Sequence, residues 1–397
     1  MKTLSNLKQL CRTAALPVVA GTLALALFTP SASPTRLRLH SGGGIAAPIP
    51  LGVRIGPHPL ISAHLNYYGG PVISNVRVVM VRYGSGTYLG NIAGNTAPTM
   101  ASWYQQVTNS AYMDWLREYN TDLPGGTNQN IGRGFFAGTF QITPDATRNG
   151  TTISEQNVRD ELAAQLDAGN LPAADANTIY MIHFPKGKKE TSGVLTSCVG
   201  FCAFHNSFSH GGKNIYYSVH PDFSSGSGCD TVCGSGTEFQ NQGYAASHEM
   251  IETVTDATPN NGWYDPNYPN GTDPKGNPVF GAEIGDICNQ QETSFTGTDG
   301  QSYTVQKEWS NANNTCIAFP NANYYVDGVN GSDFNFGTPS HPFKTIRAAH
   351  NFVPANGKTI IYVRPTNYPE PPLPLFMNKV EQIVNWNGSG TVHVGSP

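Results

Sequence analysis

The chain has 397 residues, enough for two or three domains, and only 13% of them are charged. Its 43 glycines and 29 prolines predict a turn-rich extracellular protein of mostly β or α+β structure, and they argue against a helical bundle or coiled coil. A hydrophobic share of 39% excludes wholesale disorder, and the net charge of -4 argues against the basic face of a general nucleic-acid binder.

The N-terminus has the order of a secretory signal peptide. Basic residues precede an uncharged apolar stretch from Ala14 to Phe28, and small residues suitable for cleavage follow it. The alternative is a single membrane anchor, but the stretch is short for a span of about 20 residues. We therefore expect removal of residues 1–33, no stable membrane span afterwards, and a secreted, extracellular or periplasmic protein. Residues 34–63, which are rich in Gly and Pro, are expected to form a flexible leader.

Residues 64–320 are expected to form an α/β domain, because strand and helix patterns alternate along them around one twisted sheet. Short apolar runs bounded by turn residues predict strands over residues 75–83, 134–142, 178–184 and 214–220. Apolar residues at helical spacing predict helices over residues 97–119, 154–168 and 237–256. A loop rich in Pro, Gly and Asn is expected from there to residue 280.

Six cysteines remain after removal of the signal peptide, and all of them lie in this domain. An even number of cysteines in an exported chain predicts up to three disulfides, with fifteen possible pairings that the sequence does not choose among. Their CxxxC spacings leave metal ligation as an alternative. The six residues are Cys198, Cys202, Cys229, Cys233, Cys288 and Cys316.

The segment Ser247–Glu252, on the third expected helix, is the sharpest chemical motif. His248 and Glu252 are four positions apart and therefore share one helical face, where such a pair can grip a divalent metal. Glu249 would then lie beside the open metal position and act as the general base toward bound water. The segment thus matches the H-E-x-x-H motif of zinc peptidases, with a glutamate in place of the second histidine.

A third metal ligand must come from outside this motif. Glu283 is the preferred candidate, followed by Asp286 and Asp256, while Asp265 is a further acidic side chain in the region. Residues 230–292 hold ten acidic residues and one basic residue, a repulsion that a cation would relieve. Zinc is the preferred metal, with calcium or manganese as alternatives.

Simpler interpretations of the same residues remain open. HExxE also occurs by chance, and a surface helix often carries such charges. His205 and His210 lie between the cysteine pairs and could approach the metal, but we interpret them as structural histidines.

The chain resembles the secreted phosphate-induced (EXORDIUM-like) family over residues 64–318. The segments that carry this resemblance are Tyr67–Val72, Gly200–His205, Ser247–Ala257, Gly262–Asp265 and Glu283–Cys288. Ala257 stands where bacterial-type relatives usually have proline. The resemblance implies an exported protein with a matching fold. Plant members are linked to the cell wall and growth and lack the HExxE. The resemblance therefore does not by itself establish a peptidase activity.

Residues 323–397 resemble the entry segment of right-handed parallel β-helix proteins of the pectin-lyase-like group. The resemblance is carried by Tyr324–Gly328, Asn330–Asp333, Pro342–Ile346 and Ile360–Pro365. About three coils fit in this length, and the carbohydrate-cleaving residues of larger members lie on later coils. We expect residues 321–397 to be a truncated module that docks on the first domain or assists surface binding.

These observations predict an α/β fold, a zincin-like sheet with an active-site helix, followed by a short right-handed parallel β-helix-like segment. The leading hypothesis is a secreted, disulfide-stabilised, metalloprotease-like hydrolase that acts on a peptide or a cell-wall polysaccharide and not on nucleic acid. The alternative is a non-enzymatic protein of the cell wall or extracellular matrix, with a glycan-binding β-helix stub.

Overall fold

All structural statements below come from a computed structural model and concern the residues that it describes. These are residues 44–46, 63–272, 278–319, 323–335, 337–352, 359–368, 381–386 and 390–394. The expected signal peptide lies outside this part of the chain, and so does most of the expected leader. Within the leader, β1 (Gly44–Ala46) pairs antiparallel with a strand of the main sheet.

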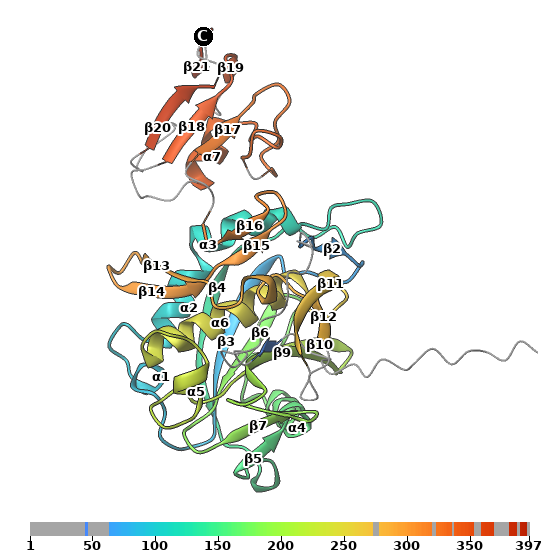
Figure 1. Ribbon diagram of the computed structural model, residues 1–397, viewed down its shortest axis with the longest axis vertical. Coiled ribbons are helices and arrows are strands. Elements are labelled where there is room, and N and C mark those ends of the chain that lie inside the picture. Colours follow the sequence, from blue (N-terminus) through green and yellow to red (C-terminus); the bar gives the residue numbers. More distant parts are fainter. Residues whose placement is uncertain are drawn as a thin grey trace, which may run out of the picture. The chain divides into compact units, whose positions relative to one another are not determined.

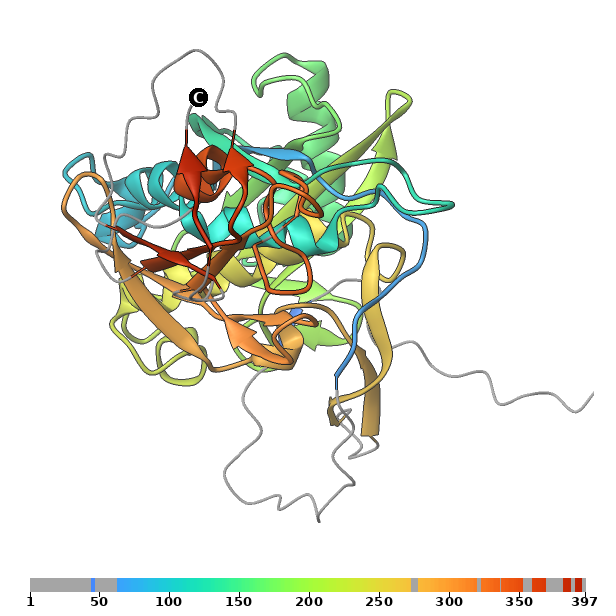
Figure 2. The ribbon, with the colours of Figure 1, turned by 90° about the horizontal axis from the view of Figure 1, so that it is seen from above.

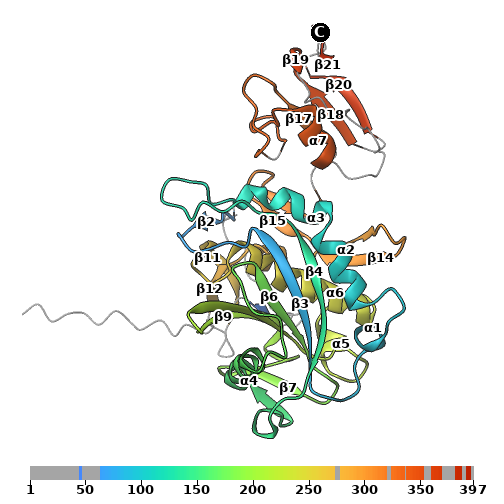
Figure 3. The ribbon, with the colours of Figure 1, turned by 180° about the vertical axis from the view of Figure 1, so that it is seen from behind.

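A six-stranded mixed sheet forms the centre of the main domain (Figure 3). Its strand order is β1-β9-β10-β6-β3-β4. The four strands β10, β6, β3 and β4 run parallel, whereas β9 pairs antiparallel with β10. These strands are β3 (Asn75–Tyr83), β4 (Gly132–Ile142), β6 (Thr178–His183), β9 (Phe201–His210) and β10 (Lys213–His220).

Strand β3 shows how the sequence builds a core on each face of this sheet. Its run of β-branched residues suits a strand that is buried on both sides. Val76 and Val78 enter one apolar core, and Val79 and Val81, which point to the opposite face, enter the other. The sheet is therefore covered on both faces.

Helices provide much of that cover (Figure 1). On one face lie α2 (Met100–Thr108) and α6 (Glu238–Thr255), and on the other lies α4 (Glu155–Asp167). Each of these three helices begins with a capping box, which fixes where it starts. The shorter helices are α1 (Gly90–Ala93), α3 (Ala111–Asp114), α5 (Cys229–Val232), η1 (Trp115–Tyr119), η2 (Ala146–Arg148) and η3 (Asp286–Cys288).

Small sheets extend this framework. Figure 2 shows β11 and β12 in gold as a long two-stranded arm, and β2 completes their sheet. Two antiparallel hairpins follow, β13–β14 and β15–β16, and β5, β7 and β8 form a further sheet. The strands are β2 (Asn66–Tyr67), β5 (Thr152–Ser154), β7 (Lys189–Ser192), β8 (Leu195–Thr196), β11 (Trp263–Thr272), β12 (Pro278–Ala282), β13 (Glu292–Thr296), β14 (Ser302–Gln306), β15 (Glu308–Ser310) and β16 (Thr315–Ile317).

The six cysteines form three disulfides, so they are not metal ligands. The pairs are Cys198–Cys229, Cys202–Cys233 and Cys288–Cys316. The first attaches the start of α5 to the turn that precedes β9, and the second attaches the residue after α5 to β9 itself. The third attaches η3 to β16.

The C-terminal segment is built from parallel strands. β17, β18 and β20 form one parallel sheet, and β19 pairs parallel with β21. This pairing agrees with the expected direction of the strands, while the β-helix assignment itself stays a prediction. The elements are β17 (Asn323–Val326), α7 (Ile346–Phe352), β18 (Thr359–Val363), β19 (Asn367–Tyr368), β20 (Glu381–Asn385) and β21 (His393–Val394).

Two differences from the sequence-based expectations have clear physical causes. The single helix expected over residues 97–119 is divided, because Asn109 leaves the helical conformation and Ser110 caps a new helix. The loop that we expected up to residue 280 contains β11 and the first part of β12. Among the described residues, no helix is long and apolar enough to cross a membrane.

Candidate metal centre

Helix α6 brings the HExxE residues into the interior of the domain. Thr237 caps the helix, and apolar residues such as Met250 and Val254 pack it against the sheet. His248, Glu249 and Glu252 are all 0% exposed. Three ionisable side chains in an apolar interior are costly unless each finds a compensating charge or hydrogen bond.

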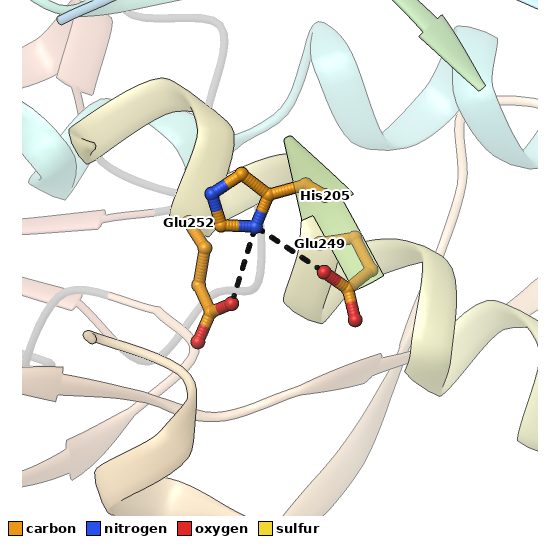
Figure 4. A group of neighbouring side chains, drawn as sticks. All are labelled: His205, Glu249 and Glu252. Carbon is orange, nitrogen blue, oxygen red and sulfur yellow. Dashed lines mark hydrogen bonds and ion pairs between the residues drawn. The ribbon is translucent and has the colours of Figure 1, made fainter. Parts of the chain in front are cut away.

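One group of possible ligands joins α6 to β9 (Figure 4). His205 Nδ1 lies 3.3 Å from Glu249 Oε2 and 3.5 Å from Glu252 Oε2. Ligands about 2.1 Å from a tetrahedral metal are about 3.4 Å from one another. His205 Nδ1 is therefore at ligand-like spacing from both carboxylates, and the three residues offer ligand atoms within 4.8 Å of one another.

A second group shares Glu252 and reaches the segment after β12. His248 Nε2 lies 3.0 Å from Glu252 Oε1 and 3.9 Å from Asp286 Oδ1. The backbone N–H of Asp286 also donates to Glu252 Oε1 at 3.1 Å. Gly285 allows this approach, because a Cβ at that position would lie 2.7 Å from His248 Nδ1.

The ring of His248 is oriented by Gln306 on β14. Gln306 Nε2 donates to the carbonyl of Gly285 at 2.7 Å, which leaves Gln306 Oε1 facing His248 Nδ1 at 3.1 Å. His248 must then donate from Nδ1, and its Nε2 atom faces the carboxylates of Glu252 and Asp286. Metal-binding histidines commonly have such an outer hydrogen bond.

Glu283 lies on the outer side of His205. Its Oε1 atom is 3.6 Å from His205 Nε2, the ring nitrogen that faces away from Glu249 and Glu252. This distance is too long for a hydrogen bond, so Glu283 faces the outer nitrogen of His205 without binding it. The preferred third ligand from the sequence is thus near the site, but Asp286 is closer to His248.

The other acidic candidates, Asp256 and Asp265, accept hydrogen bonds from backbone N–H groups. Asp256 ends α6 and accepts hydrogen bonds from the N–H groups of Asn260, Asn261 and Gly262. Asp265 accepts from the N–H groups of His64 and Asn267. Both carboxylates hold turns or chain crossings and neither belongs to the two groups described above, although Asp256 also shares a side-chain hydrogen bond with Glu283.

Several buried atoms of the cluster have no partner in hydrogen-bond geometry, although a charged group lies close to some of them, as Glu252 Oε1 lies 3.0 Å from His248 Nε2. Unpaired buried polar atoms are rare in folded proteins, so their concentration at one place points to a ligand. They are His205 Nε2, His248 Nε2, Glu249 Oε1, Glu252 Oε2, Glu283 Oε1 and Asp286 Oδ1.

The electrostatics of the cluster favour positive charge. Burial lowers the pKa of His205, but its hydrogen bonds and charge interactions with Glu249 and Glu252 outweigh burial and raise this pKa to about 10. Burial, reinforced by the charge of Glu252, raises the pKa of Asp286 to about 8. The same two causes raise the pKa of Glu283 well above its ordinary value. The cluster therefore attracts positive charge, as protons or as a metal ion.

Other histidines in the domain show that burial alone does not produce this behaviour. His183 and His220 stack with ring centroids 4.9 Å apart, and burial lowers the pKa of both. His210 lies at the end of β9, where it pairs with Asp167 at 2.8 Å, outside the cluster. The carboxylates around His205 and His248 are what distinguish these two residues.

Sequence reasoning placed His205 among the structural histidines and gave no role to Gln306 or Gly285. The segment Gly200–His205 was noticed for its resemblance, but its strand was not predicted. Gln306 and Gly285 carry no local signal, because each matters only through a contact with α6.

Comparison with protein families, with curated proteins and with solved structures found no match.

Proposed function

We propose that this protein binds a divalent cation in the buried cluster that residues of α6 form with His205 of β9 and Asp286 of η3. The observation that carries the proposal is the convergence of unpaired, fully buried imidazole nitrogens and carboxylate oxygens from α6, β9 and the loop into η3. His205, His248, Glu249, Glu252 and Asp286 offer ligand atoms, Gln306 orients the ring of His248, and Glu283 faces the outer nitrogen of His205. Because imidazole and carboxylate ligands together suit zinc, zinc is the preferred ion, with manganese or calcium as alternatives.

Elemental analysis of the purified protein tests this directly. We expect stoichiometric divalent metal in the wild type and loss of that metal in His248→Ala. The matched control is His210→Ala, which removes an imidazole outside the cluster and should keep the metal. Wild-type protein without stoichiometric metal, even after incubation with zinc, manganese and calcium in turn, would contradict the proposal.

Metal-dependent hydrolysis is the candidate activity, and the free carboxylate oxygen of Glu249 supports it. A bound divalent cation would supply Lewis acidity to a water molecule or a substrate oxygen. Glu249 Oε1 has no partner, so this carboxylate is available to accept a proton, and His205 holds its other oxygen. Peptide and cell-wall polysaccharide are the substrates to test.

Replacement of Glu249 by Gln separates catalysis from binding. If the metal is held by the second group (His248, Glu252 and Asp286) and Glu249 is the base, the variant is expected to keep its metal and lose activity on peptide substrates by about 100-fold or more. Hydrolysis by wild type and variant is compared at equal metal content. Activity that is unchanged in Glu249→Gln would exclude this base.

The non-enzymatic alternative is supported by burial. His205 and His248 are 0% exposed, Glu283 is 2% exposed and Asp286 is 8% exposed. A cation enclosed in this way stabilises the fold without meeting a substrate. In this case the protein would retain wall glycan without turnover, and Glu249→Gln would leave that retention unchanged.

An exported location is proposed for either use of the cation. Three disulfides are typical of oxidising compartments and are rare in the cytosol. Fractionation of cells that express the full chain, with detection in the medium or periplasm, tests this location.

A further inference from the structure

A surface pocket lies beside the candidate metal centre. Its volume is about 230 Å³. Disulfide-bonded Cys202 and Cys233 and the side chain of Tyr244 are buried in its wall, whereas Thr231 and Ser235 are exposed. The remaining lining residues are Val232, Gly234, Asn289, Gln290 and Glu292.

The pocket uses the same elements as the metal centre. Tyr244 stands on α6 four residues before His248, which places the two side chains on one face about 6 Å apart along the helix. Asn289 follows η3, the element that begins at Asp286. Glu292 is paired with Gln306, the residue that orients His248, across the β13–β14 hairpin.

These walls are connected by hydrogen bonds. The hydroxyl of Tyr244 donates to Asn289 Oδ1 at 2.7 Å and accepts from the N–H of Gln290 at 2.7 Å. The pocket is thereby attached to the chain that leaves η3. A ligand in the pocket would contact a rigid wall directly continuous with the metal-binding segment.

The chemistry of the lining selects positive charge. None of the lining residues is basic, and Glu292 is the only carboxylate among them. Glu292 Oε1 accepts from Ser235 Oγ at 3.2 Å, and both residues line the pocket, so this oxygen is the one that a cation in the pocket would meet. The disulfide Cys202–Cys233, Val232 and the ring of Tyr244 provide apolar surface in the same pocket.

We propose that this pocket binds the lysine or arginine side chain of a peptide, with its cationic head on Glu292 and its methylene stem on the disulfide wall. Such side chains bury an apolar stem and keep a charged end, which matches this division of the lining. The volume is below the ~300–1,000 Å³ of small-molecule sites, so the pocket suits one side chain.

In the hydrolase candidate the pocket is a specificity subsite next to the centre, and in that role the inference rests on the proposed function. Binding of the side chain itself does not need the metal. Metal content is measured separately, so a protein without metal that still binds the cationic probe would refute the proposed function and leave the pocket standing.

Calorimetric titration of the full-length protein with N-acetyl-lysine amide tests the proposal. We expect saturable binding that is at least about fivefold tighter than that of N-acetyl-norleucine amide, which has a similar stem without the charge. Glu292→Gln should remove this preference. Asp122→Asn is the matched control, because Asp122 is an exposed carboxylate in the loop between η1 and β4, and it should keep the preference.

A second variant covers the case in which Glu292→Gln does not fold. Thr231→Arg adds a cation at the exposed rim and should weaken binding of the lysine probe by a similar factor. Equal binding of the lysine and norleucine probes to the wild type would overturn the proposal. Glucosamine bound as tightly as the lysine probe would also overturn it, in favour of an amino sugar.

Discussion

Chelation of the metal is expected to lower the melting temperature of this protein by roughly 8 °C, the largest stability effect that the structure predicts. A ligand that binds only the folded state stabilises it by about 4 kcal/mol when its free concentration is a thousand times Kd. For a domain of this size that corresponds to roughly 2 °C or more per kcal/mol. Calorimetry of the metal-loaded protein, with and without EDTA, measures the shift.

The Asp286→Asn variant is expected to change the stability of the protein in opposite directions with metal and without it. Asn can still accept from the N–H of Glu283, as Asp286 Oδ2 does at 3.2 Å, but it no longer adds charge beside Glu252. With metal present the variant should be less stable than the wild type, because a ligand is lost. In EDTA at neutral pH it should be more stable by about 1 kcal/mol or more, because Asp286, whose pKa burial and Glu252 raise to about 8, must take up a proton on folding and asparagine need not.

Asp122→Asn is again the matched control, and it should melt with the wild type under both conditions. Equal melting temperatures of the wild type with and without EDTA would exclude a cation that links α6, β9 and η3. If Asp286→Asn were destabilised equally in both conditions, the role of Asp286 would be hydrogen bonding and not metal binding.

The part of the site that lies on one helix could be predicted from sequence. Helical spacing places His248 and Glu252 on one face, and the polar cap at Thr237 gives the start of α6 to within a residue. Strand β3 was equally clear, because a long β-branched run has few alternatives. Such features depend on neighbouring residues only.

The part that depends on contacts distant in sequence was missed. Strand β9 mixes Ala, Cys, Asn and Ser with its aromatic residues, so its pattern does not indicate a strand. The pairing of β9 with β10 places His205 opposite Ser218 and beneath α6, a position that no local pattern contains. The disulfide pairing likewise depends on how β9 meets α5.

Gly285 is the residue whose replacement tests the geometry of the centre most directly. Its φ of -79° is ordinary, so the glycine is required here for space and not for backbone conformation. An added Cβ would lie 2.7 Å from His248 Nδ1 and 3.0 Å from Glu252 Oε1. Both partners are fully buried, so they have little room to move.

Gly285→Ala is therefore expected to weaken cation binding by about 10- to 100-fold, the usual range when the support of a ligand is disturbed. Overpacking should also cost about 1–3 kcal/mol of unfolding free energy. Competition with a chelating indicator measures the affinity, and urea unfolding in EDTA measures the metal-independent cost.

Gly90→Ala is the matched control, because a Cβ at Gly90 meets nothing within 4 Å and the residue lies in helix α1. It should leave the cation affinity unchanged and be neutral or slightly stabilising, since alanine is preferred to glycine in helices. A Gly285→Ala protein that is destabilised but binds the cation as the wild type does would place the ion away from His248. The first group, around His205, would then be the remaining location, because its ligands do not include the ring that the new methyl group displaces.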